Sequence, residues 1–291
     1  MTLTTISKEE FTSFANTVSH RSFIQSAEMA DLLEKRGNTV QFIAWKQEDQ
    51  VQVAAILYSL PMTGGLHMEI NSGPLYQEET MLEPFYAALK DYAKENGAIE
   101  LVIKPYDTYQ TFDSDGNPTS EEQTHFMDTL KNLGYQHDGL TTGYPGGEGD
   151  WHYVKDMEGI TEKNLLKSFS KKGKPLVKKA KSFGIELKRL NRDELQLFKD
   201  ITSSTSDRRD YQDKTLDYYQ TFYDSFGDNA DFMIATLNFH HYYTNLEKDQ
   251  GKLAQKIEKL QKDLEVNPNS EKKQNQLREF SSQFDTFEVR K

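Results

Sequence analysis

Cysteine is absent from this chain of 291 residues, which excludes disulfide bonds, thiolate metal ligands and a cysteine nucleophile. Long apolar runs are missing as well. None approaches the ~20 residues that a membrane-spanning helix needs, so the sequence excludes an integral membrane protein. The N-terminal residues lack the basic start and the apolar stretch of a secretory signal. Together these absences predict a cytosolic protein.

Basic residues are in the minority, with 35 Lys and Arg against 46 Asp and Glu, and the net charge of −11 disfavours a general nucleic-acid binder. The balance reverses between residues 167 and 190, where nine basic residues stand against one acid. The basic segment, as we call it, comprises Lys171, Lys174, Lys178, Lys179 and Lys181. It predicts a localised anionic partner, which is phosphate, RNA or an acidic lipid surface. The alternative is a solvated surface without a partner.

The first half of the chain alternates between strand patterns and helix patterns. Two apolar, β-branched runs at 40–45 and 51–60 flank a polar turn and predict a hairpin. Strands are further expected at 66–70 and 100–103, and amphipathic helices at 81–96 and 121–133. This mixture predicts an α/β domain.

A loop rich in glycine, YPGGEGDW at 144–151, is the best boundary between domains. It fits neither of the common phosphate-binding glycine motifs. After it we expect a strand at 152–155, a basic helix over 162–182, strands at 185–190 and 232–237, and helices at 192–203 and 216–226. The second half therefore begins as another α/β unit.

The last fifty residues have a different pattern, that of a helical hairpin. Apolar residues of the first helix are spaced 7, 4, 3 and 4 apart, which is a heptad seam, and the sequence VNPNS then breaks the helix. A second amphipathic helix follows it. Two such helices joined by a short turn predict an antiparallel coiled-coil arm. The apolar residues are Leu246, Leu253, Ile257, Leu260 and Leu264 in the first helix and Leu277, Phe280, Phe284 and Phe287 in the second.

Common catalytic signatures are missing. The sequence has no GxSxG elbow and no HExxH pair, and its seven histidines show no ligand spacing, so we expect no metal. The glycine pattern by which ordinary N-acetyltransferases hold acyl-CoA is also missing. Lys214 and Tyr218 stand four residues apart, about one helical turn, and together can hold a phosphate oxygen. Such pairs are also common on solvated helices.

Several segments in order along the whole chain resemble the FemABX family of non-ribosomal peptidyltransferases, and most closely its branch of streptococcal MurM and MurN. The resemblance is carried by SFIQSAEMADLLEKRG, MEINSGPLY, IELVIKPYDTYQ, LKNLGYQHDG, LLKSFSKKGKPLVKKAKSFGIELK, QDKTLDYYQTF and NFHHYYTNLEKD, followed by the helical hairpin.

The resemblance implies a fold of three parts. These are an acetyltransferase-like domain over 1–147, an incomplete second such domain over 148–240 and the coiled-coil arm over 241–291. Family members continue past the arm, so the chain is expected to be truncated at its C-terminus. We therefore expect it to transfer amino acids poorly or not at all.

The reaction implied is transfer of an amino acid, Ala or Ser, from aminoacyl-tRNA to an amine of the peptidoglycan precursor lipid II. That amine belongs to the stem-peptide lysine or to the first bridge residue. No cofactor is implied. The implied partners are aminoacyl-tRNA, the precursor, the inner face of the cytoplasmic membrane, and further copies of this chain or of its relatives.

The resemblance also implies site residues. Lys214 and Tyr218 would contact the phosphates and sugar of the precursor. A precursor-binding lysine of the family falls on Leu33, and Lys35 and Arg36 are expected to replace it. The basic segment would bind tRNA or an anionic surface. The catalytic residues stay unassigned, because a carboxylate implicated in some members falls on Lys104.

Two rival functions remain open. One is a non-catalytic module that binds tRNA or a partner through the arm and the basic segment. The other is an acyl-CoA-dependent N-acyltransferase, which binding of acetyl-CoA would favour and the missing glycine loop disfavours.

Overall fold

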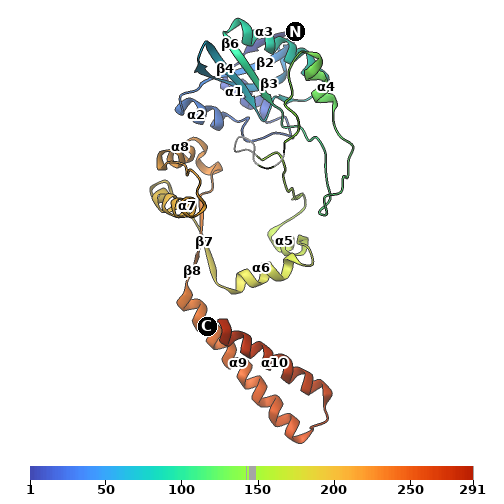
Figure 1. The fold of residues 1–291 in the computed structure, drawn as a ribbon, viewed down its shortest axis with the longest axis vertical. Coiled ribbons are helices and arrows are strands. Elements are labelled where there is room, and N and C mark those ends of the chain that lie inside the picture. Colours follow the sequence, from blue (N-terminus) through green and yellow to red (C-terminus); the bar gives the residue numbers. More distant parts are fainter. Residues whose placement is uncertain (142, 144–148, 291) are drawn as a thin grey trace. The chain divides into compact units, whose positions relative to one another are not determined.

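The computed structural model describes residues 1–141, 143 and 149–290 (Figure 1). The chain forms two compact units. The first joins Met1–His152 to Leu195–Ala230, and the second joins Tyr153–Glu194 to Asp231–Lys291. The stretch 195–230 thus packs with the N-terminal unit, whereas the sequence assigned it to a second domain. The domain division 1–147, 148–240 and 241–291 stays a prediction, and of its boundary loop, residues 144–148 lie outside the described residues.

The first unit is built on a six-stranded sheet in the order β1-β2-β3-β4-β6, with β5 paired to β3. Its strands pair antiparallel except β4 and β6, which run parallel. The predicted hairpin and the two further predicted strands are confirmed. Their apolar residues alternate between the two sides of this sheet, as residues of a β-strand do. The strands are β1 (Thr2–Thr5), β2 (Thr39–Gln47), β3 (Gln50–Met62), β4 (Gly65–Asn71), β5 (Leu75–Tyr76) and β6 (Ala98–Lys104).

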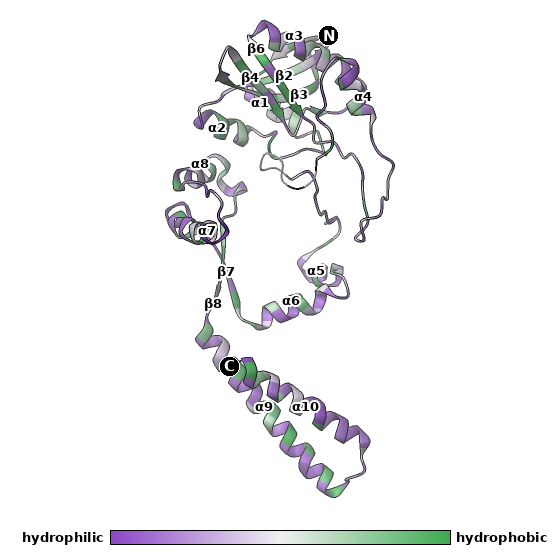
Figure 2. Cartoon of the chain, in the orientation of Figure 1, coloured by the Kyte–Doolittle hydropathy of each residue, from purple (hydrophilic) through white to green (hydrophobic). Residues whose placement is uncertain are grey.

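Helices cover both faces of this sheet. On one face α3 (Leu82–Glu95) and α4 (His125–Asn132) pack on a core that includes Phe85 and Leu89, both fully buried. On the other face α1 (Lys8–Ala15) and α2 (Ala27–Lys35) pack on apolar residues of β2, β3 and β5. Strands appear hydrophobic in Figure 2, as a sheet between two helical layers requires. The helix predicted at 121–133 is shorter than expected, since it begins at His125.

Strands β3 and β4 pair over only part of their length. They pair from Met62 and Gly65 as far as Tyr58 and Glu69, after which β3 pairs with β5 instead. The buried side chain of Gln25 spans the gap. Its Oε1 accepts from the Ile56 N–H at 2.8 Å, and its Nε2 donates to the Asn71 carbonyl at 2.7 Å. One side chain therefore replaces the backbone hydrogen bonds that the two strands no longer share.

Two further helices belong to the first unit, α7 (Leu195–Arg209) and α8 (Leu216–Phe226). The hydroxyl of Thr215 accepts from the Tyr218 N–H and caps α8, which is why the helix begins where it does. Helix α8 packs against α2, and the ring of Phe226 lies 5.9 Å from that of Phe23. This packing brings residues near 35 together with residues near 218.

The second unit contains a two-stranded antiparallel sheet and four helices among its described residues. Two predictions for it are wrong. Residues 152–155 form no strand, and the helix expected over 162–182 is two helices that meet at 169–172. The elements are α5 (Glu162–Ser168), α6 (Gly173–Ser182), β7 (Ile185–Arg189), β8 (Met233–Leu237), α9 (Phe239–Val266) and α10 (Glu271–Arg290).

Helices α9 and α10 form the predicted arm, with the break at the proline-containing turn. Leu246 and Leu253 are buried in the seam, as the heptad spacing requires. The seam also holds a polar contact, in which Gln250 donates to Glu288 at 2.6 Å. In Figure 2 both helices alternate hydrophilic and hydrophobic residues. The prediction of a helical hairpin is confirmed, and its description as a coiled coil stays a prediction.

Candidate functional site

Four residues named by the sequence lie together in the first unit, and we call them the cationic cluster: Lys35, Arg36, Lys214 and Tyr218. The first two stand at the C-terminal end of α2, and the last two at the start of α8. The guanidinium carbon of Arg36 lies 4.3 Å from the centre of the Tyr218 ring. The Lys214 Nζ lies 5.4 Å from the same centre. Two cations therefore share one ring.

The remaining member of the cluster is fixed by α8. Lys35 donates from its Nζ to the Ser225 Oγ at 3.0 Å. Lys214 stands before helix α8, next to the capping residue Thr215. Lys214 and Tyr218 therefore do not lie on one helical turn, as their spacing had suggested. The side chains of Lys35, Arg36 and Lys214 are exposed, while Tyr218 is half-buried.

Asp213 holds the loop that carries Lys214. Its carboxylate accepts from the Lys199 Nζ at 2.6 Å, from the Tyr219 hydroxyl at 2.9 Å and from the backbone N–H of Lys214 at 2.8 Å. The hydrogen bond from Lys199 is the largest cause that lowers the pKa of Asp213 well below its usual range. Asp213 is thus ionised at neutral pH, and it fixes the backbone from which Lys214 extends.

The chemistry that the cationic cluster supports is recognition of an anion. Arginine offers a planar fork of donors, lysine a compact charge, and tyrosine a hydroxyl, which together suit phosphate oxygens. The cations sit close together on one ring instead of being spread over the surface. The sequence could predict the pair Lys214 and Tyr218 from spacing, but Arg36 joins them only through the packing of α2 on α8.

The basic segment lies in the second unit. Lys174, Lys178, Lys179 and Lys181 are on α6, with the last three exposed. Lys171 stands in the turn before that helix, although the sequence predicted it within a basic helix over 162–182. Pro175 lies in the first turn of α6, where a missing N–H costs no helical hydrogen bond.

The structure shows the contacts of Leu33 and Lys104, the two positions at which the sequence departs from the pattern of the family that it resembles. Leu33 is half-buried against the core beneath α1 and α2, a place for an apolar side chain. Lys104 lies at the end of β6, and its Nζ is 2.9 Å from Glu69 Oε1. Glu69, on the neighbouring strand, is a functional candidate that the sequence reasoning missed. The available signal was one carboxylate within the apolar strand sequence MEIN.

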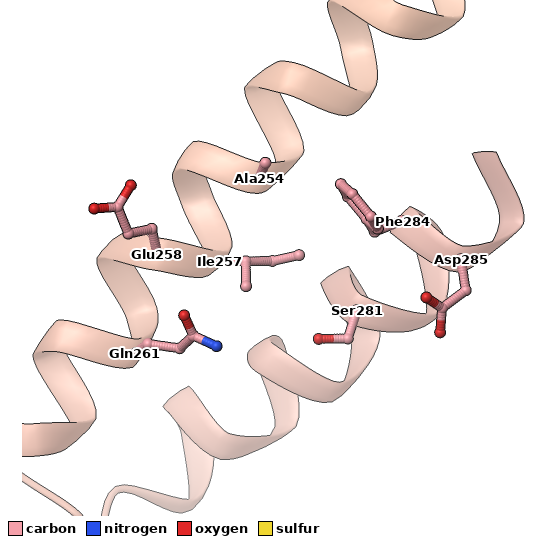
Figure 3. A pocket seen from close by; sticks show the side chains of 7 residues that line it. All are labelled: Ala254, Ile257, Glu258, Gln261, Ser281, Phe284 and Asp285. Atoms are coloured by element: carbon pink, nitrogen blue, oxygen red, sulfur yellow. The ribbon is translucent and has the colours of Figure 1, made fainter. Parts of the chain in front are cut away.

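One hollow of about 280 Å³ lies in the arm, between α9 and α10. Figure 3 shows Ile257 and Phe284 directed into it, with Glu258 and Asp285 at its rim. The small residues Ala254 of α9 and Ser281 of α10 also line it. The hollow is a packing gap of the arm and holds none of the residues predicted for the site.

Among the described residues, none of the helices combines the length and the apolar character that a membrane crossing needs.

Comparison with known proteins gives a consistent family. The model of the FemAB family matches residues 6–291. The aminoacyltransferase FemB of Staphylococcus epidermidis is 29% identical over 253 residues, which are 85% of this chain and 61% of that protein. The aminoacyltransferase FemA of Staphylococcus aureus is 26% identical over 294 positions, covering 99% of this chain and 70% of FemA. The chain thus spans 61% of the length of the FemB relatives.

The solved structures show a similar fold. The crystal structure of FemX matches with a TM-score of 0.66 at 19% sequence identity, over 99% of this chain and 71% of that one. The mixed α/β architecture predicted from the sequence agrees with this match.

Proposed function

Because the chain belongs to the FemAB family, we propose that it is an aminoacyltransferase of peptidoglycan bridge synthesis. The reaction proposed is transfer of Ala or Ser from aminoacyl-tRNA to the stem-peptide lysine, or to the first bridge residue, of lipid II. Two named aminoacyltransferases among the relatives, FemB and FemA, support this class of reaction. The streptococcal MurM and MurN branch stays a prediction.

In the aminolysis of an ester, an enzyme contributes mainly by positioning the two reactants and needs no covalent intermediate. The acceptor amine must be neutral and held against the ester carbonyl, which is where binding energy lowers the barrier. No enzyme nucleophile is needed, which suits a chain without cysteine. The protein must hold two large anionic substrates.

The observation that carries the proposal is the cationic cluster. Arg36, at the end of α2, and Lys214, in the loop before α8, both approach the ring of Tyr218. We assign to this cluster the diphosphate and sugar of the precursor, with Lys35 at its edge. The spacing of two cations on one ring favours a ligand with several neighbouring phosphate oxygens.

The basic segment supplies a second cationic surface, and we propose that tRNA binds to it. Four of its five lysines lie on one short helix, α6, and their charge stands against the acidic average of the chain. The same charge suits the anionic inner face of the cytoplasmic membrane, where the lipid-linked precursor resides. We place the protein there as a peripheral protein, and we include further copies or relatives as partners.

The proposal is tested by binding and by transfer. A short-chain lipid II analogue is titrated into the wild-type chain and into Arg36→Gln and Lys214→Gln. Each substitution removes one charge-assisted contact, so affinity should fall about tenfold or more. Lys94→Gln, on the exposed side of α3, is the matched control and should bind as the wild type does. Transfer is followed with a labelled amino acid on tRNA.

The outcomes separate the candidates. Unchanged affinity in both variants contradicts the assignment of the cationic cluster. Binding of precursor and tRNA without transfer favours the non-catalytic binding module. Binding of acetyl-CoA, in place of charged tRNA, favours the acyl-CoA-dependent enzyme.

A further inference from the structure

One side of β4 and β6 carries ionisable residues where a sheet face is usually apolar. We call them the Glu69 cluster: Tyr58, His67, Glu69, Glu100 and Lys104. They come from three adjacent strands and share one face, because Tyr58 stands opposite Glu69 in the β3–β4 pair and Glu69 opposite Val102 in the β4–β6 pair. Met68 and Ile70 of β4 face the other side and belong to the core under α3.

Glu69 lies at the centre of the cluster, and only 9% of its side chain is exposed. It receives the Lys104 Nζ at 2.9 Å, the His67 Nε2 at 3.2 Å and the Tyr58 hydroxyl. Burial raises the pKa of Glu69, and these hydrogen bonds lower it by more, so the net shift is downward. Glu69 is therefore an ionised carboxylate that is nearly enclosed.

His67 connects Glu69 with solvent. Its Nδ1 lies 2.6 Å from the Oε2 of Glu100, whose side chain is 53% exposed, and its Nε2 faces Glu69. A neutral imidazole has one N–H, so only the doubly protonated ring donates to both carboxylates. Burial lowers the pKa of His67, and the hydrogen bonds to Glu100 and Glu69 raise it by more. The proton on His67 is thus held by two carboxylates.

The side chains around Glu69 are partly exposed, with 23% of His67, 53% of Glu100 and 45% of Lys104 accessible to solvent. The apolar residues beneath α1 and α2 come from β2, β5 and the first half of β3, whereas the cluster lies on β4, β6 and the second half of β3. Leu60 of β3, opposite His67, is 39% exposed and offers an apolar surface beside the charges. A chain of methylene groups ending in a cation matches such a surface.

The loop before α2 links this cluster with the cationic cluster. Gln25 donates to the carbonyl of Asn71, two residues after Glu69, and the ring of Phe23 meets Phe226 of α8. Glu69 and Lys104 stand near the carboxyl ends of the parallel strands β4 and β6, the edge at which open α/β sheets bind ligands.

We propose that Glu69 binds the primary ammonium group of the acceptor, and that its arrival drives the proton of His67 through Glu100 into solvent. The inference rests on the proposed function, since it assigns the amine end of the same substrate. The ammonium takes the place of the imidazolium beside Glu69 Oε2, while Lys104 stays paired with Glu69 Oε1. A second positive charge beside His67 then favours its neutral form.

Glu69, His67 and the departing ribose oxygen account for every proton that moves during the transfer. Glu69 takes one proton from the bound ammonium, and the neutral amine attacks the ester carbonyl. The new C–N bond forms and the ester C–O bond breaks. The second amine proton goes to the departing ribose oxygen. Glu69 then returns its proton to His67, so each turnover delivers one proton to solvent and restores the cluster.

The test counts protons on binding and needs no turnover. A short-chain lipid II analogue with a free lysine amine is titrated calorimetrically at pH 7 in two buffers of different ionisation enthalpy. The same analogue with that amine acetylated is the matched ligand. We expect proton release on binding of the free amine and none on binding of the acetylated one, by proton linkage.

Variants separate the role of Glu69, which binds the ammonium, from that of His67, which releases the proton. Glu69→Gln should lose both the proton release and the preference for the free amine, while binding through the cationic cluster remains. His67→Gln should lose the release and keep the preference. Glu95→Gln, on exposed α3, should change neither. The far-ultraviolet circular dichroism of each variant should match that of the wild type; if Glu69→Gln alone fails to fold, the His67→Gln result decides.

The outcomes distinguish this inference from the proposed function. Binding of both analogues with equal affinity and no proton release overturns the inference and leaves the proposed function standing. Release that persists in Glu69→Gln and in His67→Gln also overturns it. Failure of both analogues to bind the wild type overturns the proposed function, and this inference with it.

Discussion

Replacing Gln25 with alanine should weaken the first unit far more than a typical glutamine substitution. The side chain is 2% exposed and satisfies two backbone groups at the point where β3 and β4 separate. Its removal leaves the N–H of Ile56, itself 1% exposed, and the carbonyl of Asn71 without these partners. Each buried group that loses its hydrogen bond costs about 1–3 kcal/mol. The expected loss in the free energy of unfolding for the two groups is therefore about 2–6 kcal/mol.

The measurement is native-state hydrogen exchange at the Ile56 amide, combined with urea unfolding followed by circular dichroism. A chain with two units has no single unfolding free energy, so the local amide gives the more direct reading. A loss of 2 kcal/mol corresponds to exchange about 30-fold faster. Gln77→Ala is the matched control, because that exposed glutamine makes one hydrogen bond to Thr17 at 2.8 Å. It should cost about 0.5 kcal/mol or less.

Two results would refute this reasoning. One is exchange at Ile56 that is unchanged in Gln25→Ala, which would mean that the N–H has another partner. The other is equal destabilisation by Gln25→Ala and Gln77→Ala. An ordered water that fills the gap and bonds both groups would reduce the loss without abolishing it.

Two predictions concern the second unit. Leu253→Lys combined with Leu260→Lys places charges in the heptad seam, so the arm should unpair and helical circular dichroism should fall; unchanged helicity would mean that the hairpin does not depend on this seam. Reversing Lys178, Lys179 and Lys181 to glutamate should weaken binding to tRNA or to anionic vesicles, with a steep salt dependence in the parent. If the triple variant binds both as tightly as the parent at low salt, these lysines are solvated surface.

The elements that the sequence predicts well are those with strong periodicity. The strands of the hairpin, the helix at 81–96 and the arm all match, because each buries one regular face. The failures have local causes. Residues 152–155 carry a strand-like composition but find no partner strand in the described chain, and serine, glycine and proline between 170 and 175 divide the expected basic helix.

The site divides in the same manner. Lys214 and Tyr218 are visible from spacing, whereas the stacking of Arg36 on Tyr218 depends on two helices about 180 residues apart in the sequence. Nothing in the sequence pattern states that α8 packs on α2 of the first unit. Glu69 was missed because one acid in a strand is, by itself, weak evidence; its importance follows from the neighbours that β3 and β6 bring to it.

Stability alone does not explain why β4 carries a carboxylate at position 69. The strand lies between β3 and β6, and its other face is apolar. Removing an ion pair from water costs about as much as the pair regains, so well-packed apolar residues of similar size are often as stable or more so. The cluster also places an ionised group beside a histidine whose proton has an exit to solvent. Charges that are costly in a sheet and connected to solvent are typical of sites that move protons. The position of Glu69 beside the loop that leads to the cationic cluster therefore supports a role in the reaction.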